Sequence, residues 1–232
     1  RLRDLPARGS TRLKDFTLPA ALNNARWCDA VCRAHGNTGR FLMHSWVNAE
    51  PVPRFYPNVV TLQSGKAALA EQRDAIAILL KSNLPGRWSV KDSFRTLDLS
   101  RLGFELLFEA RWIRNTMPAA DVPSDIVWQR ETKGAAGLPF DDPDFAMFTG
   151  RRGFQVVAGG MFYRADGVVG LTNVVADAGD ARTVWRALAL LAARTFPRLP
   201  LVGYESGDEL KAAREAGYEI GDKLRIWVRS KD

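Results

Sequence analysis

The feature that most constrains the fold is an internal repeat. The stretch that begins at Asn58 aligns with the stretch that begins at Asn173. Four pairs of residues anchor the alignment at nearly constant offsets: Asn58 with Asn173, Val90 with Val202, Gly103 with Gly217, and Trp112 with Trp227. The offsets change only between anchors, where loops accept insertions. Such self-similarity predicts one small fold written twice in the chain.

Each copy is expected to contain a strand, an amphipathic helix, a second strand, a short helix that ends at glycine, and a final strand with tryptophan. In the first copy, the strands and the long helix are predicted at 58–62, 69–80, 88–90 and 105–114. In the second copy they are predicted at 168–175, 183–193, 199–204 and 224–229. Alternation of strands and helices of this kind indicates an α/β or α+β fold.

The repeats suggest domain boundaries. We predict an N-terminal arm at 1–18, a first repeat at 19–115, a linker at 116–125 and a second repeat at 126–232. Further strands are expected at 40–46 and 154–163. The second of these belongs to a hairpin that turns at Ala165-Asp166-Gly167, because Asp-Gly suits a turn with positive φ. Residues 131–144 are predicted to form a long loop.

Composition indicates an ordinary globular protein. The 232 residues are 46% hydrophobic and 25% charged, and no apolar run approaches the roughly 18 residues of a membrane span. We therefore expect a cytoplasmic protein without a membrane partner. The two cysteines, Cys28 and Cys32, stand four residues apart in a predicted helix, where we interpret them as core residues. His35 and His44 lie nearby in sequence, but we predict no metal site.

The net charge of +7 belongs to the first half of the chain. Residues 1–115 hold 18 basic and 10 acidic side chains, whereas residues 116–232 hold 15 and 16. This asymmetry is compatible with a phosphate-bearing ligand or with nucleic acid. A solvated basic arm explains much of it, so nucleic acid is not the partner we expect.

The order of elements in the second copy resembles that of the GCN5-related N-acetyltransferase (GNAT) superfamily. The segment Leu210–Glu219, with its glycine-aromatic pair Gly217-Tyr218, is similar to the family's segment after the fifth strand. The resemblance implies two GNAT-like repeats, each a mixed, mostly antiparallel sheet flanked by helices. It also implies an acyltransferase that uses acetyl-CoA or another acyl-CoA as substrate.

In that family the pantetheine arm of CoA pairs with a strand edge, and the N-terminus of the next helix holds the pyrophosphate. Carried onto the second copy, the strand edge is Asn173, Val174 and Val175. The pyrophosphate turn is Ala178, Gly179, Asp180, Ala181 and Arg182, with a carboxylate on either side of Gly179, from Asp177 and Asp180. The first copy offers Gln63, Ser64, Gly65 and Lys66 in the basic half as an alternative.

Catalytic candidates lie at the end of the strand before the last helix. The family often places a general-acid tyrosine where this chain has Ala213 and Leu99, neither of which can move a proton. The resemblance therefore directs attention to Tyr204 and Glu205, and to Lys91, Asp92 and Ser93 at the corresponding place of the first copy. A carboxylate there could deprotonate an attacking amine through a water. The alternative is structural, with Tyr204 half-buried against the sheet and Glu205 capping the next helix.

Three functions follow from this reading. The first is an acyl-CoA-dependent N-acyltransferase acting on a small amine, an amino acid or a peptide amine, with the acceptor pocket between the copies. The second is a catalytically silent GNAT-like protein that binds a ligand or partner. The third is an aminoacyl transferase associated with tRNA or another nucleic acid. Binding of acyl-CoA and salt-dependent binding of nucleic acid distinguish them.

Overall fold

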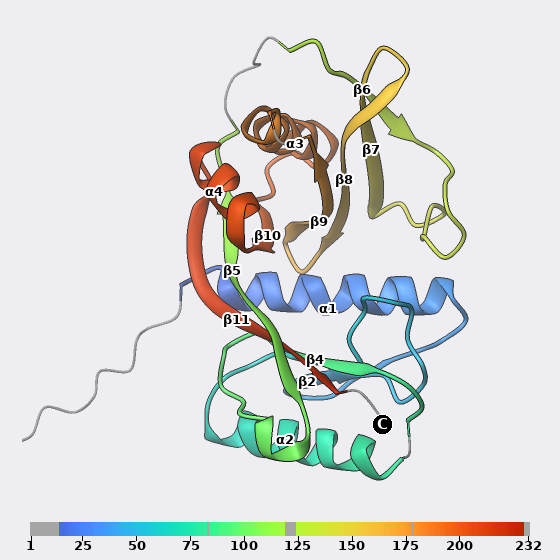
Figure 1. Cartoon of the computed structure of the whole chain (residues 1–232), viewed down its shortest axis with the longest axis vertical. Coiled ribbons are helices and arrows are strands. Elements are labelled where there is room, and N and C mark those ends of the chain that lie inside the picture. Colours follow the sequence, from blue (N-terminus) through green and yellow to red (C-terminus); the bar gives the residue numbers. More distant parts are fainter. Residues whose placement is uncertain (1–13, 83, 119–123, 178, 230–232) are drawn as a thin grey trace, which may run out of the picture.

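The computed structural model describes residues 14–82, 84–118, 124–177 and 179–229. Within these residues the chain forms an 11-stranded mixed sheet with helices packed on it (Figure 1). The helices are α1 (Thr17–Ala34), α2 (Lys66–Lys81), the short 3-10 helix η1 (Ser100–Leu102), α3 (Ala181–Thr195) and α4 (Gly207–Glu215). The predicted fold class, a mixed sheet flanked by helices, is confirmed.

The strands of the first half are β1 (Arg40–Phe41), β2 (Ser45–Val47), β3 (Val59–Thr61), β4 (Trp88–Asp92) and β5 (Glu105–Asn115). Those of the second half are β6 (Val127–Glu131), β7 (Phe145–Arg152), β8 (Gln155–Ala165), β9 (Val168–Ala176), β10 (Leu201–Glu205) and β11 (Glu219–Arg229). The order β3-α2-β4-η1-β5 in the first half matches β9-α3-β10-α4-β11 in the second. The predicted elements of both copies are present, with ends that differ by a few residues.

The two halves exchange their last strands. The sheet runs β1-β2-β3-β4-β11-β5-β10-β9-β8-β7-β6, so β11 lies between β4 and β5, and β5 lies next to β10. All three of these contacts are antiparallel, while β3–β4 and β9–β10 are parallel. The sequence pattern does not predict this exchange. As a result, one continuous sheet crosses both halves.

Helix α1 lies between the halves (Figure 1) and is buried on several sides. It contacts β8, β9 and β10 of the second half and β3 of the first. Alanines at 20, 21, 25 and 30 let it approach the sheet closely, and Trp27 stacks on Phe145 with centroids 5.6 Å apart. The helix that the sequence assigns to the first repeat therefore also covers one face of the second.

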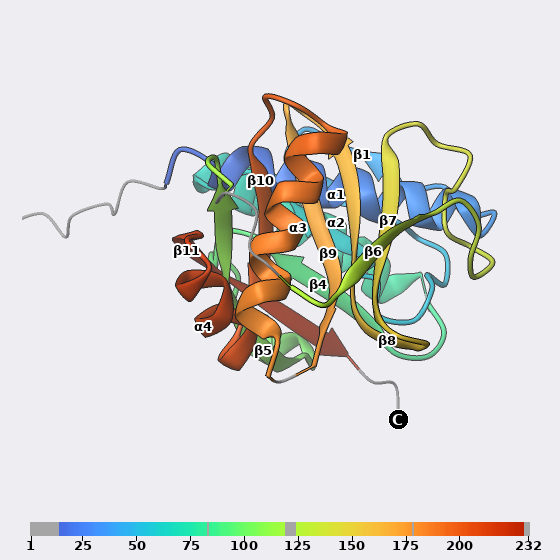
Figure 2. The ribbon, with the colours of Figure 1, turned by 90° about the horizontal axis from the view of Figure 1, so that it is seen from above.

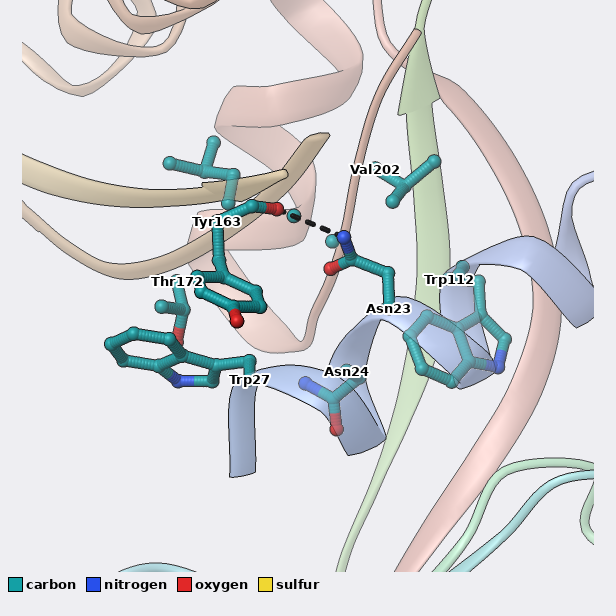
Figure 3. Close-up of a pocket in the computed structure, with 11 residues that line it drawn as sticks. Asn23, Asn24, Trp27, Trp112, Tyr163, Thr172 and Val202 are labelled. Carbon is teal, nitrogen blue, oxygen red and sulfur yellow. Dashed lines mark hydrogen bonds between the residues drawn. The ribbon is translucent and has the colours of Figure 1, made fainter. Parts of the chain in front are cut away.

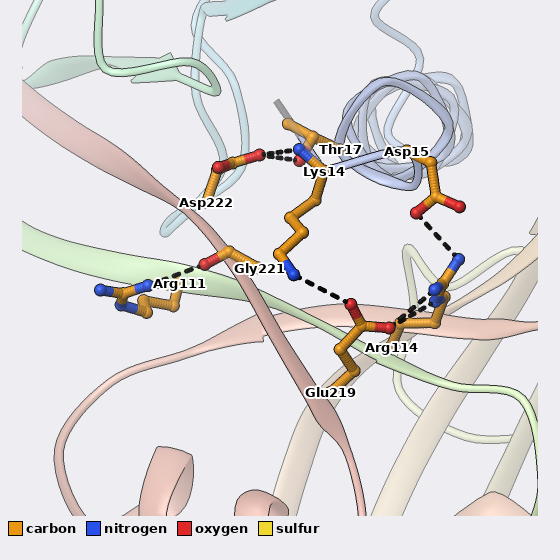
Figure 4. A network of polar contacts seen from close by, with 8 residues as sticks. All are labelled: Lys14, Asp15, Thr17, Arg111, Arg114, Glu219, Gly221 and Asp222. Atoms are coloured by element: carbon orange, nitrogen blue, oxygen red, sulfur yellow. Dashed lines mark hydrogen bonds and ion pairs between the residues drawn. The ribbon is translucent and has the colours of Figure 1, made fainter. Parts of the chain in front are cut away.

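A polar network holds the start of α1 on β5 and β11, the two exchanged strands (Figure 4). Asp222 accepts hydrogen bonds from the Lys14 amide at 2.7 Å and from the Thr17 hydroxyl at 2.6 Å. Asp222 lies where the register of β11 against β5 shifts. Nearby, Arg114 of β5 donates to Glu219 of β11 at 2.7 Å. This irregularity in β11 thus supplies a carboxylate that holds the residues at the start of α1 against the sheet.

Helices α3 and α4 cover the opposite face of the second half (Figure 2). The apolar residues of α3 recur at helical spacing, and its buried side chains are Val184, Trp185, Leu188, Ala189 and Ala192. Each large side chain buried this way contributes roughly 1.5–3 kcal/mol. Tyr218, after α4, packs edge-on against Trp185 and donates to the Trp185 carbonyl at 3.1 Å. This core holds α3 beside β9 and β10, where the candidate site lies.

Two local predictions need correction. The strand expected at 40–46 is a tight hairpin, because the Leu42 amide bonds the Ser45 carbonyl at 2.8 Å and separates β1 from β2. Glu205, considered as the cap of α4, lies one residue before the N-cap residue, which is Ser206. The predicted hairpin turn is confirmed, with positive φ at Asp166 and Gly167.

Candidate functional site

A gap opens between β9 and β10, on the line where the two parallel strands part. The strands pair only at Leu201 with Val169 and at Val202 with Gly170. Strand β9 then continues to Ala176 without β10 beside it. Backbone N–H and C=O groups along this edge therefore lack the ladder partners that a continued pair would supply.

Strand β9 has a bulge at Asn173. The φ of this residue, 51°, is positive, a conformation that costs a residue with a Cβ, although asparagine tolerates it better than most. The register of β9 on β8 shifts here, between the pairs Gly159–Val175 and Met161–Thr172. Val175 is exposed, and Val174 packs partly against the core. The three residues predicted as the pantetheine edge therefore lie on an irregular, accessible stretch of β9.

The predicted pyrophosphate turn leads into α3. Ala181 is the first residue of that helix, Gly179 is exposed with open space around it, and the Arg182 side chain is exposed. Asp180 is the N-cap residue, and its carboxylate pairs with Arg152 at 3.0 Å. Arg152 also pairs with Asp125 at 2.6 Å. Ala178 lies outside the described residues.

The corresponding region of the first half is closed. Strands β3 and β4 pair at Val59 with Val90 and at Val60 with Lys91, but the Thr61 hydroxyl then accepts from the Ser93 amide at 2.8 Å. This bond spans the position where the second half has its gap. The alternative pyrophosphate turn, Gln63, Ser64, Gly65 and Lys66, is exposed at the start of α2, and Gly65 has a φ of 109°.

A small cavity lies where β9 and β10 part, on the side that faces α1 (Figure 3). Its walls include Asn24 and Trp27 from α1, Trp112 from β5, and Leu171, Thr172 and Gly203 from the two strands. Its volume of about 10 Å³ is roughly the space of one water molecule. The cavity thus joins both halves at the gap but admits only a very small molecule in this conformation.

In the wall of the cavity, Asn23 joins α1 to the β8–β9 hairpin. Its buried side chain donates to the Tyr163 carbonyl at 2.9 Å, with weaker contacts to Ala165 and Val168 (Figure 3). A Cβ on Gly170 would collide with the Asn23 amide oxygen. Glycine at position 170 is therefore required by a side chain that fastens α1 to the β8–β9 hairpin.

Tyr204 and Glu205, the predicted catalytic pair, lie on opposite faces of β10. Tyr204 belongs to the apolar cluster on the α1 side, together with Val202 and Trp112. Because neighbouring residues of a strand point to opposite faces, Glu205 lies on the side of α3 and α4. The two candidates therefore lie on opposite faces of the sheet.

Glu205 is partly buried beside Glu209. Burial, and then repulsion from Glu209, raise the pKa of its carboxyl to about 7. Glu209 itself accepts from the Trp185 indole at 2.8 Å. A carboxyl with this pKa can take up or release a proton near neutral pH, as a general base or acid requires.

Lys91 reaches Tyr204 from the first half. Its side-chain nitrogen donates to the Tyr204 hydroxyl at 3.1 Å and to Asn24 Oδ1 at 2.6 Å, and the residue is only 5% exposed. Burial by itself lowers the pKa of Lys91, but the neighbouring Tyr204 oxygen and Cys28 sulfur raise it, and the net shift is upward. An ammonium group is thus buried between the halves.

Lys91 was predicted only as the first-copy counterpart of the catalytic positions, and Asn24 was not predicted. The signal available was a lysine inside an otherwise buried strand, with Val90 and Asp92 as its neighbours. The positions where the resemblance would place a tyrosine, Ala213 and Leu99, are both buried in apolar clusters.

The described residues contain neither a metal-binding cluster nor a membrane-spanning helix. No group of three or more histidine, cysteine, aspartate or glutamate side chains is arranged to hold a metal ion there. Nor does the described part of the chain include a helix with the length and apolar character needed to cross a membrane. Cys28 and Cys32 are buried free thiols in α1, as predicted.

Solved structures with a similar fold include GCN5-related N-acetyltransferases. One from Kribbella flavida is 13% identical, with a TM-score of 0.64 over 93% of this chain and 96% of the other. A putative acetyltransferase of the GNAT family from Novosphingobium aromaticivorans is 9% identical, with a TM-score of 0.54 over 91% and 99%. A tandem GNAT protein from the clavulanic acid biosynthesis pathway is 10% identical, with a TM-score of 0.50 over 80% and 82%.

The similarity lies in the fold rather than in the sequence. No protein-family model matches the sequence, and no curated protein sequence matches it significantly. The gap between two parallel strands, the helix that follows the free edge, and the length covered by the structural matches agree with the resemblance inferred from the sequence. This chain therefore has the fold of the GCN5-related N-acetyltransferases, and the matches cover between 82% and 99% of those structures.

Proposed function

We propose that this chain is an acyl-CoA-dependent N-acyltransferase that holds the acyl-CoA in its second half. The observation that carries the proposal is the gap between β9 and β10. One strand edge there is left unpaired beyond the second shared residue pair, and it leads directly to the start of α3. The Thr61–Ser93 hydrogen bond, in contrast, closes the equivalent position of the first half.

The chemistry of CoA fits this region. Its pantetheine arm contains amides, which suit the free main-chain groups of Asn173, Val174 and Val175. Its pyrophosphate is an anion, which the first N–H groups of a helix attract. Gly179 leaves open space beside those groups, and Arg182 adds a positive charge. The opposing charge of Asp180 is offset only in part by Arg152, which also pairs with Asp125.

The acyl-CoA would supply a thioester whose acyl group passes to an amine. In our proposal Glu205, which lies on the other face of β10, takes the proton from the amine through water in the gap between β9 and β10, since its raised pKa leaves it partly ionised near neutral pH. Tyr204 accepts a hydrogen bond from Lys91, and its own O–H is the group that would donate to the departing sulfur. The acceptor would enter the cavity on the α1 side, which must widen to receive it.

The acceptor class in this proposal is a small amine, an amino acid or a peptide amine. The proposed location is the cytoplasm, because two buried free thiols suit a reducing compartment. The main alternative is a silent protein that binds a ligand in the same gap. It is favoured by the cavity of about 10 Å³ and by the buried alanine and leucine where a tyrosine would act.

A thermal-shift titration with acetyl-CoA, free CoA and a longer acyl-CoA tests the proposal. A ligand at a hundred times its Kd should stabilise the native state by roughly 2.7 kcal/mol. Gly179→Trp should abolish this shift, because indole would fill the open space before α3. Ser64→Trp, at the exposed start of α2, is the matched control and should leave the shift unchanged.

If no acyl-CoA raises the melting temperature at millimolar concentration, the transferase proposal fails. Binding without release of free CoA thiol in the presence of any amine would favour the silent alternative.

A further inference from the structure

The inference starts from Lys91, whose ammonium group is buried without a carboxylate partner. Among the described residues its polar contacts are the neutral Asn24 oxygen and Tyr204 hydroxyl. Buried charges are normally paired, because removing an ion from water is costly unless an opposite charge compensates. A counter-charge is therefore missing from this part of the protein.

Neighbouring acidic groups do not supply it. Asp92, next to Lys91 in β4, accepts from the amides of Thr96 and Leu97 at 3.0 and 2.9 Å. Asp29 of α1 accepts from the Trp46 indole at 3.0 Å and pairs with Arg33. Each carboxylate is committed to a contact of its own. The positive charge of Lys91 remains directed at Asn24 and Tyr204.

Asn24 lies between the Lys91 ammonium group and the cavity. An ammonium group only donates hydrogen bonds, so it holds the Asn24 oxygen toward itself and turns the amide nitrogen away. Asn24 lines the cavity, and Figure 3 shows its nitrogen on the side of Trp27. That nitrogen donates to no described residue. The cavity thus has a free donor, polarised by a buried cation one side chain away.

We propose that this donor binds a carboxylate of the acceptor, so that the substrate class is amines that carry a nearby carboxylate, such as free amino acids. A carboxylate on the Asn24 nitrogen would sit close enough to Lys91 to supply the missing charge across a poorly solvated interior. The inference rests on the proposed function for the transfer itself. Recognition of the carboxylate does not depend on acyl-CoA.

The probes are N-acetyl amino acids and the same compounds as carboxamides, which are equal in shape and differ in charge. Thermal shift should show binding of the acids to the full chain at least tenfold tighter than binding of the amides. Asn24→Asp places a carboxylate where the amide now is. It should raise the melting temperature by about 2–4 °C through an internal pair with Lys91, and it should abolish the preference for acids.

Lys91→Met removes the charge and should abolish the same preference. Gln129→Glu, an exposed change on β6, is the control and should alter neither property. Equal binding of acids and amides by the unaltered chain, or no binding of either, would overturn the inference. So would an Asn24→Asp protein that melts no higher than the unaltered chain, which keeps the test decisive if Lys91→Met fails to fold.

An acetyl-CoA titration of the same proteins separates the two proposals. A preference for acids without any acetyl-CoA shift would remove the transferase proposal and keep the carboxylate site. An acetyl-CoA shift without a preference for acids would do the reverse.

Discussion

Trp112 and Tyr204 lie opposite each other on β5 and β10, with their rings edge to face and the ring centroids 5.6 Å apart. Trp112 belongs to the last strand of the first half, and Tyr204 to the second half. Such aromatic pairs stabilise by about 0.5–1.5 kcal/mol beyond their buried area. The contact is one link in a sheet that continues through both halves.

We predict that the chain unfolds in one cooperative transition. Because β5 pairs with β10, and β11 pairs with β4, neither half can lose its strands without breaking the sheet of the other. Circular dichroism and tryptophan fluorescence should therefore give coincident urea unfolding curves. Two separated transitions would show that the halves are energetically independent, despite the exchanged strands.

We predict that Gly170→Ala destabilises the fold by about 1–3 kcal/mol. The new methyl group would collide with the buried Asn23 amide and push α1 away from the β8–β9 hairpin. Urea unfolding measures the loss. Gly179→Ala, where a Cβ meets only open space, is the control and should change stability by less than about 0.5 kcal/mol. Equal stability of the two variants would contradict the clash.

We predict that Asp180→Asn strengthens binding of CoA severalfold. The change removes a negative charge at the start of α3 and frees one side of Arg152 for an anion. The Asp180 side chain makes no capping hydrogen bond, so the helix should lose little stability. Isothermal calorimetry with CoA provides the measurement, and Asp208→Asn in the first turn of α4 is the control. Weaker binding by Asp180→Asn would argue against a pyrophosphate site at α3.

We predict that Glu205 makes stability fall as pH rises toward neutrality. Its folded-state pKa of about 7 lies above its ordinary value of 4.5, so folding favours the protonated form. The associated stability is complete below about pH 4.5 and is lost as pH rises through 7, by at most about 3 kcal/mol. Glu205→Gln should flatten this dependence in urea unfolding measured at several pH values.

The exposed Glu215→Gln provides the comparison for that experiment, and it should keep the slope of the unaltered chain. If the Glu205→Gln protein also keeps the full slope, another group causes it. Under the proposed function, turnover by the unaltered chain should rise with pH to a plateau above about pH 7.

The sequence was most informative where local patterns decide the structure. The apolar spacing of 183–193 predicts α3, and Asp166-Gly167 predicts the β8–β9 turn, because both depend on residues close together in the chain. The order of elements then led to the fold. The break inside the predicted 40–46 strand was missed because the tight turn there involves Leu42, an apolar residue that the pattern assigns to a strand.

The candidate site was less predictable, because it depends on contacts between distant segments. In β4 the residues of both faces are buried, so Lys91 lies inside the protein, where an alternating pattern would leave it in water. Its partners are 67 and 113 residues away. Likewise, the sequence shows that Thr61 and Ser93 exist, but only their contact shows that the first half is closed. The assignment of the predicted site residues to CoA stays a prediction.

The exchange of last strands also determines how the fold responds to dilution. Strands β5 and β11 meet their partner strands within one molecule, so the effective concentration of each strand for its partner depends on the connecting segments. Two separate polypeptides that traded the same strands would come apart as they were diluted. In this chain covalent continuity supplies the local concentration that such an assembly would need, so the exchange by itself gives the melting temperature no dependence on protein concentration.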